Sequence, residues 1–312
     1  MLTCAAIEDV LIVVNPASGG GRTRRDWPAA AAALRSAGLR FDEAFTAAPG
    51  EATRLARQAV EEGRDVVVAA GGDGTINEVV NGFFAGGERI TGATRLGVVP
   101  MGTGGDLRRT LGLSRDAAEA ARVLTAGRVR RLDAGRVTCA GPDGAPVVRH
   151  FVNIADAGIG GDVADLVNGG FKLINGEVTF SVAAALTLLR YQNPQLHVVV
   201  DGEERDVVAQ QVVLANCRFY GGGMEIAPMA APDDGLLDLL IVGDVGRMEA
   251  TRLMGRVRRG AHLPHPKVEH RLVRRVEVSS PRRVGVDADG ERPGSLPAIF
   301  EVLPGVLEVV AP

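Results

Sequence analysis

The sequence has few cysteines and few aromatic residues, and its charges nearly balance. Three cysteines occur in 312 residues, none in a C-x-x-C spacing, which indicates neither a disulfide framework nor a cysteine zinc site. Phe, Tyr and Trp supply only 4% of the residues, so Ala, Val and Leu must build the core. The net charge of −3 provides no global attraction to nucleic acid, and we expect no such partner.

Long uncharged apolar runs are also lacking. No window approaches the roughly 18 residues that a membrane span requires. The N-terminal segment MLTCAAIEDVLIVV carries two acids and no basic region of the kind that begins a signal peptide. With the cysteine pattern, this predicts a cytoplasmic protein in a reducing setting.

The first third of the chain contains a regular alternation of strand and helix patterns. β-branched runs at 10–14, 39–45, 65–70 and 96–99 are separated by apolar residues at helical spacing. This alternation predicts βαβ units and a parallel sheet covered by helices. Pro28 is expected in the first turn of the helix that carries residues 29–34. A further helix over 116–125 should end at Gly127.

After about residue 128 the pattern changes to longer β runs. Asp143-Gly144 and Asp201-Gly202 are flanked by valine-rich segments, as in antiparallel hairpins, and helices are expected at 177–190 and 248–259. We therefore predict an α/β protein with two domains. Residues 1–130 form a parallel-sheet domain and residues 131–312 form a β-rich, sandwich-like domain, whose last strand, 307–310, could return to the first domain.

Three of the early strands run directly into glycine-containing segments, at 15–21 (NPASGGG), 71–78 (GGDGTINE) and 100–106 (PMGTGGD). Each segment precedes a plausible helix start. Ligands of open α/β sheets bind at the carboxyl ends of the strands. Glycines let backbone amides approach an anion, and a helix N-terminus adds about half a positive charge. The three loops together favour a polyphosphate.

The loops match neither of the common phosphate-binding patterns. G-x-x-x-x-G-K-[ST] is missing, and G-x-G-x-x-G does not begin the first helix. Bare phosphate would repel the carboxylate of Asp73, so a Mg²⁺ is expected between them, directly or through water. The glycines of any one loop could equally make only a tight strand-to-helix turn. Three loops in register instead predict a magnesium nucleotide.

These motifs resemble the catalytic domain shared by diacylglycerol, sphingosine and ceramide kinases, and in particular the soluble bacterial diacylglycerol kinases. The resemblance covers nearly the whole chain. The matching segments are 15–19 (N-P-x-S-G), 71–82 (G-G-D-G-T-x-N-E-V-x-N-G), 100–106 (P-x-G-T-x-N-D), 151–155, 216–228 and 233–238. One departure is Gly105, which replaces an asparagine and so removes whatever hydrogen bond that side chain makes.

The resemblance implies a set of site residues. Those that would contact ATP are Asn15, Pro16, Ala17, Ser18, Gly19, Thr46, Gly72, Asp73, Gly74, Thr75, Asn77, Glu78 and Thr103. Asp73 would also act in catalysis, through magnesium. Glu291, in a segment that resembles D-G-E, would be the base for the lipid hydroxyl, although its place in a turn before Pro293 also suits a solvated acid. A structural metal would be held by Asp234 and the carbonyls of Ala231 and Leu236.

The expected function is therefore transfer of the γ-phosphate of ATP, with Mg²⁺, to the hydroxyl of diacylglycerol or a similar lipid, as in phospholipid biosynthesis. Rivals are sphingoid or phosphatidylglycerol kinases, an NAD kinase, which shares the G-G-D-G-T loop, and a non-catalytic nucleotide-binding regulator. A homodimer is a further possibility. A lipid substrate would have to be reached at the inner face of the membrane. Arginines could contact this surface transiently, although a solvated face explains them slightly better. They are Arg252, Arg256, Arg258, Arg259, Arg271, Arg274 and Arg275.

Overall fold

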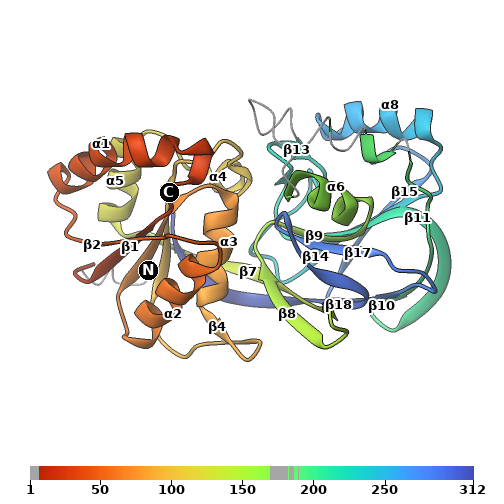
Figure 1. Ribbon diagram of the computed structural model, residues 1–312, viewed down its shortest axis with the longest axis horizontal. Helices are drawn as coiled ribbons and strands as arrows, with labels where there is room; N and C mark the ends of the chain where they lie inside the picture. Colours follow the sequence, from red (N-terminus) through yellow and green to blue (C-terminus); the bar gives the residue numbers. More distant parts are fainter. Residues whose placement is uncertain (1–6, 169–181, 183–185, 189) are drawn as a thin grey trace. The chain divides into compact units, whose positions relative to one another are not determined.

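The computed structural model describes residues 7–168, 182, 186–188 and 190–312. It divides into two compact units (Figure 1). Unit 1 consists of Met1–Leu132 with Gly305–Pro312, and unit 2 consists of Asp133–Pro304. The expected helix at 177–190 lies largely outside the described residues.

Unit 1 is built on a parallel sheet with the strand order β2-β1-β3-β6. The strands are β1 (Val10–Val14), β2 (Asp42–Phe45), β3 (Val66–Gly71) and β6 (Arg95–Pro100). The end of β18 (Glu291–Val310) adds a parallel pairing to β6, through Val309 and Leu96. Every residue of β3 is buried, as expected for a continuous apolar strand covered on both faces.

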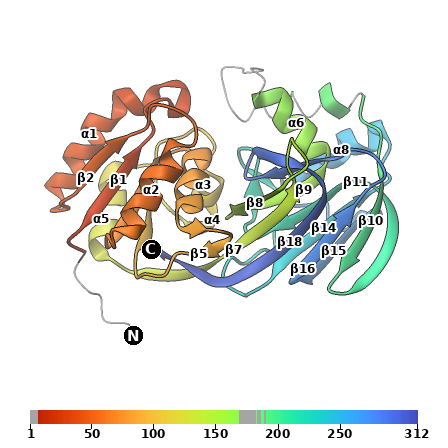
Figure 2. The ribbon, with the colours of Figure 1, turned by 60° about the horizontal axis from the view of Figure 1, so that its bottom comes forward.

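Helices cover both faces of this sheet (Figures 1 and 2). α1 (Arg22–Ser36) and α5 (Ala117–Ala126) share one apolar core with alternate residues of β1 and β3. α2 (Glu51–Glu61) and α3 (Asp73–Gly82) pack against each other over the opposite face. The remaining elements are η1 (Ser18–Gly20), β4 (Phe84–Ala85), β5 (Glu88–Arg89) and α4 (Asp106–Leu111). The predicted parallel α/β architecture is confirmed.

The helix boundaries in unit 1 agree with the sequence at α5 and differ at α1. The Asp116 carboxylate accepts the amide of Glu119 at 3.0 Å, and Gly127 ends α5 in a left-handed conformation. α1, in contrast, begins six residues before Pro28. The prediction that Pro28 stands in the first turn is therefore wrong. The left-handed Gly21 allows the helix to start at Arg22, before the proline can act as a start signal.

Unit 2 is β-rich, with a main sheet in the order β15-β14-β11-β10-β16-β18, and β9 and β17 pair with each other beside it. Its elements are β7 (Val129–Ala140), β8 (Pro146–Phe151), β9 (Ile154–Gly158), α6 (Ile159–Asn168), β10 (Gln195–Val200), β11 (Glu203–Ala215), β12 (Phe219–Tyr220), β13 (Met224–Glu225), β14 (Leu237–Gly243), α8 (Arg247–Val257), β15 (Val268–Val273), β16 (Arg275–Ser279) and β17 (Gly285–Ala288). An aliphatic core lies between the strands. The predicted β-rich second domain is confirmed.

The two predicted hairpins of unit 2 are present. β10 and β11 pair up to Val200 and Glu203, which leaves Asp201-Gly202 as a two-residue turn. Both turn residues have positive φ, 48° and 95°, which is why the sequence needs Asp-Gly there. Asp143-Gly144 lies in the loop that joins β7 to β8. These turns set the register of β7 with β8 and of β10 with β11.

Candidate nucleotide and acceptor sites

The first two glycine loops of unit 1 are joined by the side chain of Asn15. Its Nδ2 donates to Oγ1 of Thr75 at 3.0 Å, and its Oδ1 accepts the amide of Ala17 at 3.0 Å. Asn15 follows β1 and Thr75 lies in the first turn of α3. An asparagine supplies both the donor and the acceptor that this position needs.

The second and third loops touch backbone to backbone at Gly72 and Gly102. A Cβ on Gly102 would lie 2.3 Å from the Cα of Gly72, so no larger residue fits. A Cβ on Gly72 would in turn lie 3.2 Å from Oγ of Ser18 in the first loop. The amides of Met101 and Gly102 both donate to the carbonyl of Gly71, at 2.8 and 3.0 Å. The predicted meeting of the three loops at one edge of the sheet is therefore present in the structure.

Asp73 connects the second loop to the start of α4. Its carboxylate accepts the amides of Gly105, at 2.6 Å, and Asp106, at 2.8 Å. Gly105 is the position that departs from the resembled pattern, and it has the left-handed conformation φ 79°, ψ 49°. Glycine and asparagine are the residues that adopt this conformation most easily. The backbone geometry thus accounts for either residue at this position.

The helix that follows the second loop presents backbone amides at its start. α3 begins after Gly72 without a side-chain hydrogen bond to cap it, and α1 begins after Gly21 in the same way. The first-turn amides of a helix have no intrahelical partner, and the helix dipole makes that end positive. Such helix starts can bind phosphate oxygens, because the neighbouring glycines have no side chains that would block the amides.

Some of the residues predicted to contact ATP have structural partners. The Glu78 carboxylate accepts the amide of Ala52 at 3.1 Å and so caps the first turn of α2. Asn77 is 3% exposed and accepts hydrogen bonds from the Asn81 side chain. Thr46 follows β2, and its amide donates to the carbonyl of Val14 at 2.9 Å. Their ATP contacts, and those of Pro16, Gly19, Gly74 and Thr103, stay predictions.

Arginines that the sequence reasoning missed brace the third loop. Arg109 donates to the carbonyl of Gly104 at 2.8 Å, and Arg115 donates to the carbonyls of Thr103 and Gly104 at 2.7 and 3.1 Å. Arg22 donates in the same way to the carbonyl of Gly19 in the first loop, at 3.1 Å. These arginines could have been found from the sequence, because they lie close to the glycine loops along the chain. Their charges favour an anion beside the loops.

The donor set around Asp73 fits a magnesium ion that is held mainly by a ligand. Asp73 is half-buried, and each carboxylate oxygen keeps a lone pair beyond the one used by an amide. Among the described residues, no group of three or more His, Cys, Asp or Glu side chains could hold a metal. Mg²⁺ is commonly bound by one or two carboxylates together with substrate phosphates and water. The residues present therefore suit a nucleotide-borne ion.

In unit 2, Glu291 follows a tight turn that is held by Asp289. Asp289 and Gly290 have φ of 52° and 86°, and Ala288 pairs with Glu291 across the turn. The Asp289 carboxylate also accepts three successive amides at 2.9–3.0 Å, those of Val152, Asn153 and Ile154. Glu291 itself is half-buried. Asp289, missed as a positioning residue, fixes the turn that carries the predicted base.

Asp156 on β9 lies directly opposite Asp287 on β17. Burial raises the pKa of Asp156 to about 7. Burial, together with the negative charge of Asp156, raises the pKa of Asp287 well above its ordinary range. Ionising two buried carboxyl groups side by side would place two negative charges close together with little water to screen them. The pair therefore retains a proton near neutral pH. Sequence reasoning missed this pair, because only the strand register brings the two residues together.

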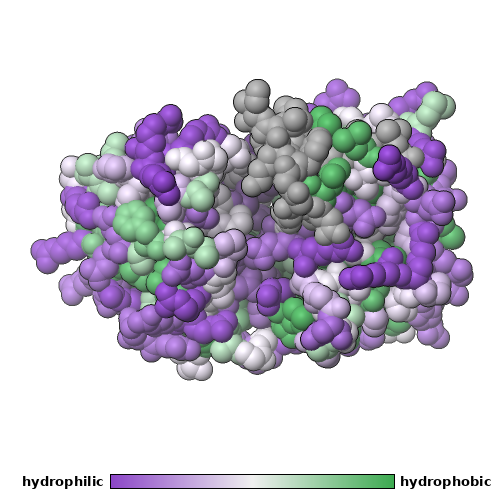
Figure 3. Space-filling view, in the orientation of Figure 1, coloured by the Kyte–Doolittle hydropathy of each residue, from purple (hydrophilic) through white to green (hydrophobic). Residues whose placement is uncertain are grey.

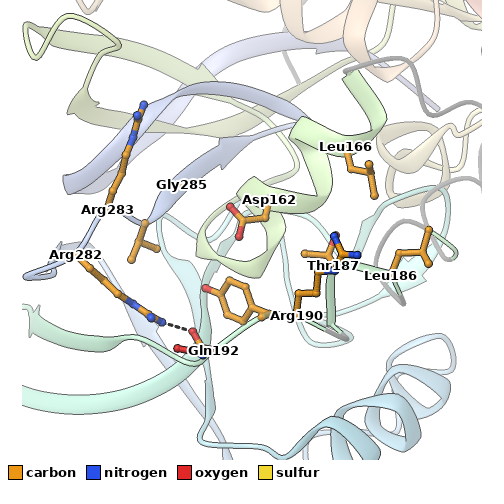
Figure 4. A pocket seen from close by; sticks show the side chains of 11 residues that line it. Asp162, Leu166, Leu186, Thr187, Arg190, Gln192, Arg282, Arg283 and Gly285 are labelled. Atoms are coloured by element: carbon orange, nitrogen blue, oxygen red, sulfur yellow. Dashed lines mark hydrogen bonds between the residues drawn. The ribbon is translucent and has the colours of Figure 1, made fainter.

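A pocket of about 710 Å³ opens in unit 2 between α6 and residues 282–285. Figure 4 shows Asp162 pointing from α6 towards the pocket, Arg282 reaching the carbonyl of Gln192, and Arg283 pointing away. Leu166 on α6 and Leu186 form apolar walls of this pocket, and Leu186 is 45% exposed. Apolar side chains also gather around α6 on the face in Figure 3. Apolar walls beside arginines could take an amphiphile.

The predicted structural metal site is a surface turn. Asp234 is exposed, and its Oδ1 accepts the amide of Leu236 at 3.0 Å. Asp133 reaches the same turn and accepts the amide of Gly235 at 2.7 Å. The turn thus offers hard oxygen ligands, including the carbonyls of Ala231 and Leu236, and the metal assignment stays a prediction.

The predicted basic surface is divided by ion pairs. Arg271 pairs with Glu203 at 3.2 Å, and Arg275 pairs with Glu277 at 3.2 Å and with Glu301. Three arginines on or next to α8 are exposed and form no ion pair within the described part of the chain: Arg252, Arg256 and Arg259. Of the helices that the structure describes, none combines the length and hydropathy of a membrane span.

Two family descriptions match the chain, one for each half. The diacylglycerol kinase catalytic domain matches residues 9–137, and the YegS C-terminal NAD kinase beta sandwich-like domain matches residues 153–311. A diacylglycerol kinase of Staphylococcus aureus (strain bovine RF122 / ET3-1) is 32% identical over 301 residues, which is 96% of this chain and 91% of the relative. A diacylglycerol kinase of Staphylococcus carnosus (strain TM300) is 30% identical, with 96% and 94% covered.

Solved structures share the fold. A diacylglycerol kinase from Bacillus anthracis str. Sterne superposes with a TM-score of 0.76 at 24% identity, over 98% of this chain and 97% of that one. Yeast NADH kinase complexed with NADH gives a TM-score of 0.55 at 13% identity, over 97% and 83% of the two chains. These two likenesses concern the fold alone. From the sequence relatives, which match over almost their whole length, the chain belongs to the diacylglycerol kinase family.

Proposed function

We propose that this kinase transfers the γ-phosphate of ATP to the hydroxyl group of a lipid, with diacylglycerol as the first candidate acceptor. The observation that carries the proposal is the meeting of three glycine loops beside the start of α3, where Gly72 and Gly102 touch and Asp73 joins the second loop to the third. Membership of the diacylglycerol kinase family supports a lipid as the acceptor.

Unit 1 is proposed to bind the nucleotide. The amides at the start of α3 and the glycine backbones of the loops would bind the phosphates, and the nearby arginines would offset part of the negative charge. Asp73 would hold a magnesium ion carried by the nucleotide. When bound, Mg²⁺ neutralises charge on the phosphates. Because phosphoryl transfer depends mainly on positioning and charge stabilisation, the rigid loop contacts are the important contribution of this unit.

Unit 2 is proposed to bind and deprotonate the acceptor. The lipid hydroxyl oxygen attacks the γ-phosphorus, the bond from that phosphorus to the bridging oxygen breaks, and ADP leaves. The hydroxyl proton passes to the Glu291 carboxylate, whose turn is fixed by Asp289. The 710 Å³ pocket beside α6 has the apolar walls that the lipid chains require. A metal held by Asp234 would stabilise its surface turn, and the arginines on α8 would assist contact with the inner membrane surface.

The test is transfer of labelled γ-phosphate from Mg-ATP to diacylglycerol, sphingosine, ceramide and phosphatidylglycerol in mixed micelles, with NAD as the non-lipid control. Label on a lipid supports the proposal and identifies the acceptor. Label on NAD alone would indicate an NAD kinase instead of a lipid kinase. ATP binding without transfer to any acceptor would favour a non-catalytic nucleotide-binding regulator.

A matched pair of variants tests the base. Glu291→Gln should bind ATP normally but lose about 10²- to 10⁴-fold in kcat, the usual contribution of a positioned general base. Glu204→Gln, at an exposed position on β11, should retain full activity. Full activity in Glu291→Gln would exclude Glu291 as the base.

A further inference from the structure

The side chain of Arg108, on α4, packs against the position where this chain departs from the resembled pattern. A Cβ on Gly105 would come within 2.9 Å of Nε of Arg108 and within 3.6 Å of its Cβ and Cδ. The arginine therefore folds back over residue 105 and takes space that a side chain there would fill. Glycine at this position is the condition for the observed placement of the guanidinium group.

The guanidinium group of Arg108 is held by the protein at one end only. Its Nη1 donates to the carbonyl of Leu113 at 3.0 Å, and this is the one hydrogen bond that the side chain forms with the described residues. Nε is enclosed against Gly105 without a partner there, and Arg108 as a whole is half-buried. The Nη2 group carries two more N–H donors. A positioned cation thus keeps donors for a ligand.

The charges around Arg108 favour an anion. Burial lowers the pKa of Arg108, and the positive charges of Arg115 and Arg109 lower it further. The carboxylates of Asp73 and Asp106 act in the opposite direction without compensating for these effects. Both acids already have partners, since Asp73 accepts two backbone amides and Asp106 pairs with Arg109 at 3.2 Å. An anion would reduce the repulsion among the three arginines.

The position of Arg108 suggests which anion this is. Gly105, against which it packs, donates its amide to Asp73, the residue proposed to face the magnesium ion of the nucleotide. The guanidinium group is therefore beside the glycine loops where the phosphates are proposed to bind. Its planar fork of N–H groups matches the spacing of phosphate oxygens.

We propose that Arg108 binds a phosphate group of the nucleotide, and that Gly105 leaves the room that this requires. The inference rests on the proposed function, because it takes the glycine loops as the nucleotide site. Arg108 then supplies a positive charge to three loops, 15–21, 71–78 and 100–106, whose sequences contain no lysine. An asparagine at 105 would displace the guanidinium group, so residues 105 and 108 act together.

Calorimetric titration of the full chain with Mg-ATP and with magnesium tripolyphosphate tests the contact without requiring turnover. Arg108→Gln should weaken the binding of both probes by about tenfold or more, as expected when a charge-assisted hydrogen bond is lost. The two losses should be similar, because the contact is made to phosphate and not to the base or sugar. Unchanged affinity for both probes would overturn the inference.

The matched control is Arg122→Gln on α5. It also removes one positive charge from unit 1, but Arg122 is exposed and pairs with Glu119. This variant should bind both probes as the parent protein does. An equal loss of affinity in Arg122→Gln and Arg108→Gln would show that only the net charge matters, and would refute a specific contact.

Urea denaturation without nucleotide separates a phosphate contact from a structural role. Arg108→Gln removes the hydrogen bond to Leu113 but also relieves repulsion from the other arginines, so its midpoint should remain close to that of the parent protein. If Arg108 only fastened the end of α4, the midpoint would fall together with the affinity. That result would refute the phosphate contact.

A double-mutant cycle tests the dependence on residue 105. In Gly105→Asn the guanidinium group is already displaced, so adding Arg108→Gln should change the affinity for Mg-ATP by about twofold or less. An equal loss in both backgrounds would refute the role of Gly105.

Transfer of labelled γ-phosphate to the lipid panel is measured separately. Weaker Mg-ATP binding in Arg108→Gln, without transfer by the parent protein, would reject the lipid kinase but retain the phosphate contact. Transfer by the parent protein, with equal affinity in the variant, would retain the kinase and reject the role of Arg108. A parent protein that binds neither probe would reject both.

Discussion

The carboxylate of Asp73 accepts a hydrogen bond from the backbone amide of Gly105 at 2.6 Å. This hydrogen bond depends on the backbone conformation at position 105 and needs no side chain there. Gly105 is left-handed, and that conformation turns its amide and the next one towards Asp73. The asparagine of the resembled pattern would be compatible with the same backbone. The departure at Gly105 therefore leaves the link between the second and third loops intact.

Substitutions at Gly105 should separate conformation from side-chain chemistry. Gly105→Asn should change the free energy of unfolding by less than about 0.5 kcal/mol, because Asn tolerates left-handed φ. Gly105→Ala should lose about 1 kcal/mol from backbone strain. A Cβ here would approach Nε of Arg108 at 2.9 Å, but that flexible side chain can move. Urea denaturation of both variants measures the difference, and equal losses would contradict this account.

The contact between Gly72 and Gly102 predicts a sharp contrast between two glycines of the loops. Gly102→Ala should destabilise the protein by about 1–3 kcal/mol and weaken nucleotide binding, because its Cβ would overlap the Gly72 backbone. Gly74→Ala has open space and lies in the first turn of α3, so it should be neutral or stabilising by up to about 1 kcal/mol.

Thermal unfolding and ATP titration of the two glycine variants distinguish the causes. If Gly74→Ala keeps its stability but loses ATP affinity, the phosphates approach the backbone at Gly74. If Gly102→Ala is as stable as the parent protein, the loops do not meet as described.

The exposed arginines on α8 allow a direct test of membrane contact. Arg256→Gln with Arg259→Gln should weaken the binding constant for anionic vesicles, measured by cosedimentation, by about tenfold or more, since each exposed cation contributes about 1 kcal/mol near anionic lipid. The matched control is Arg271→Gln, which removes an arginine already paired with Glu203. Binding to neutral vesicles should not change in either variant. Unchanged binding to anionic vesicles would show that these arginines form only a solvated helix face.

Local sequence patterns were sufficient to predict most strands and helices of the fold. Contacts between individual side chains of distant segments could not be predicted from such patterns. The apolar runs of β1 and β3 and the Asp-Gly turn at 201–202 carry their structure in adjacent residues. Asp156 and Asp287 have no such local signal, because they become neighbours only through the register of β9 and β17. Asp289 likewise reveals its role only through the amides of residues 152–154. The glycine loops could be recognised in the sequence because glycine marks the positions where the backbone leaves no room for a side chain or adopts a left-handed conformation.

The buried acid pair predicts that stability falls as pH rises. In the unfolded chain Asp156 would titrate near its ordinary value of 3.8, whereas in the folded protein its pKa is about 7. Between these values the folded state holds a proton that the unfolded state has released, so raising the pH favours unfolding. The raised pKa of Asp287 acts in the same direction.

Asp156→Asn should reduce this dependence, because the amide stays neutral and only the burial of Asp287 then opposes ionisation of the pair. Its gain in unfolding free energy over the parent protein should be larger at pH 8 than at pH 5, by on the order of 1–3 kcal/mol. Urea denaturation at the two pH values measures the difference, with Glu61→Gln, at an exposed position on α2, as the control that should follow the parent protein at both. Parallel pH profiles for Asp156→Asn and the parent would mean that the acid pair is already ionised, and that water reaches it more freely than its burial indicates.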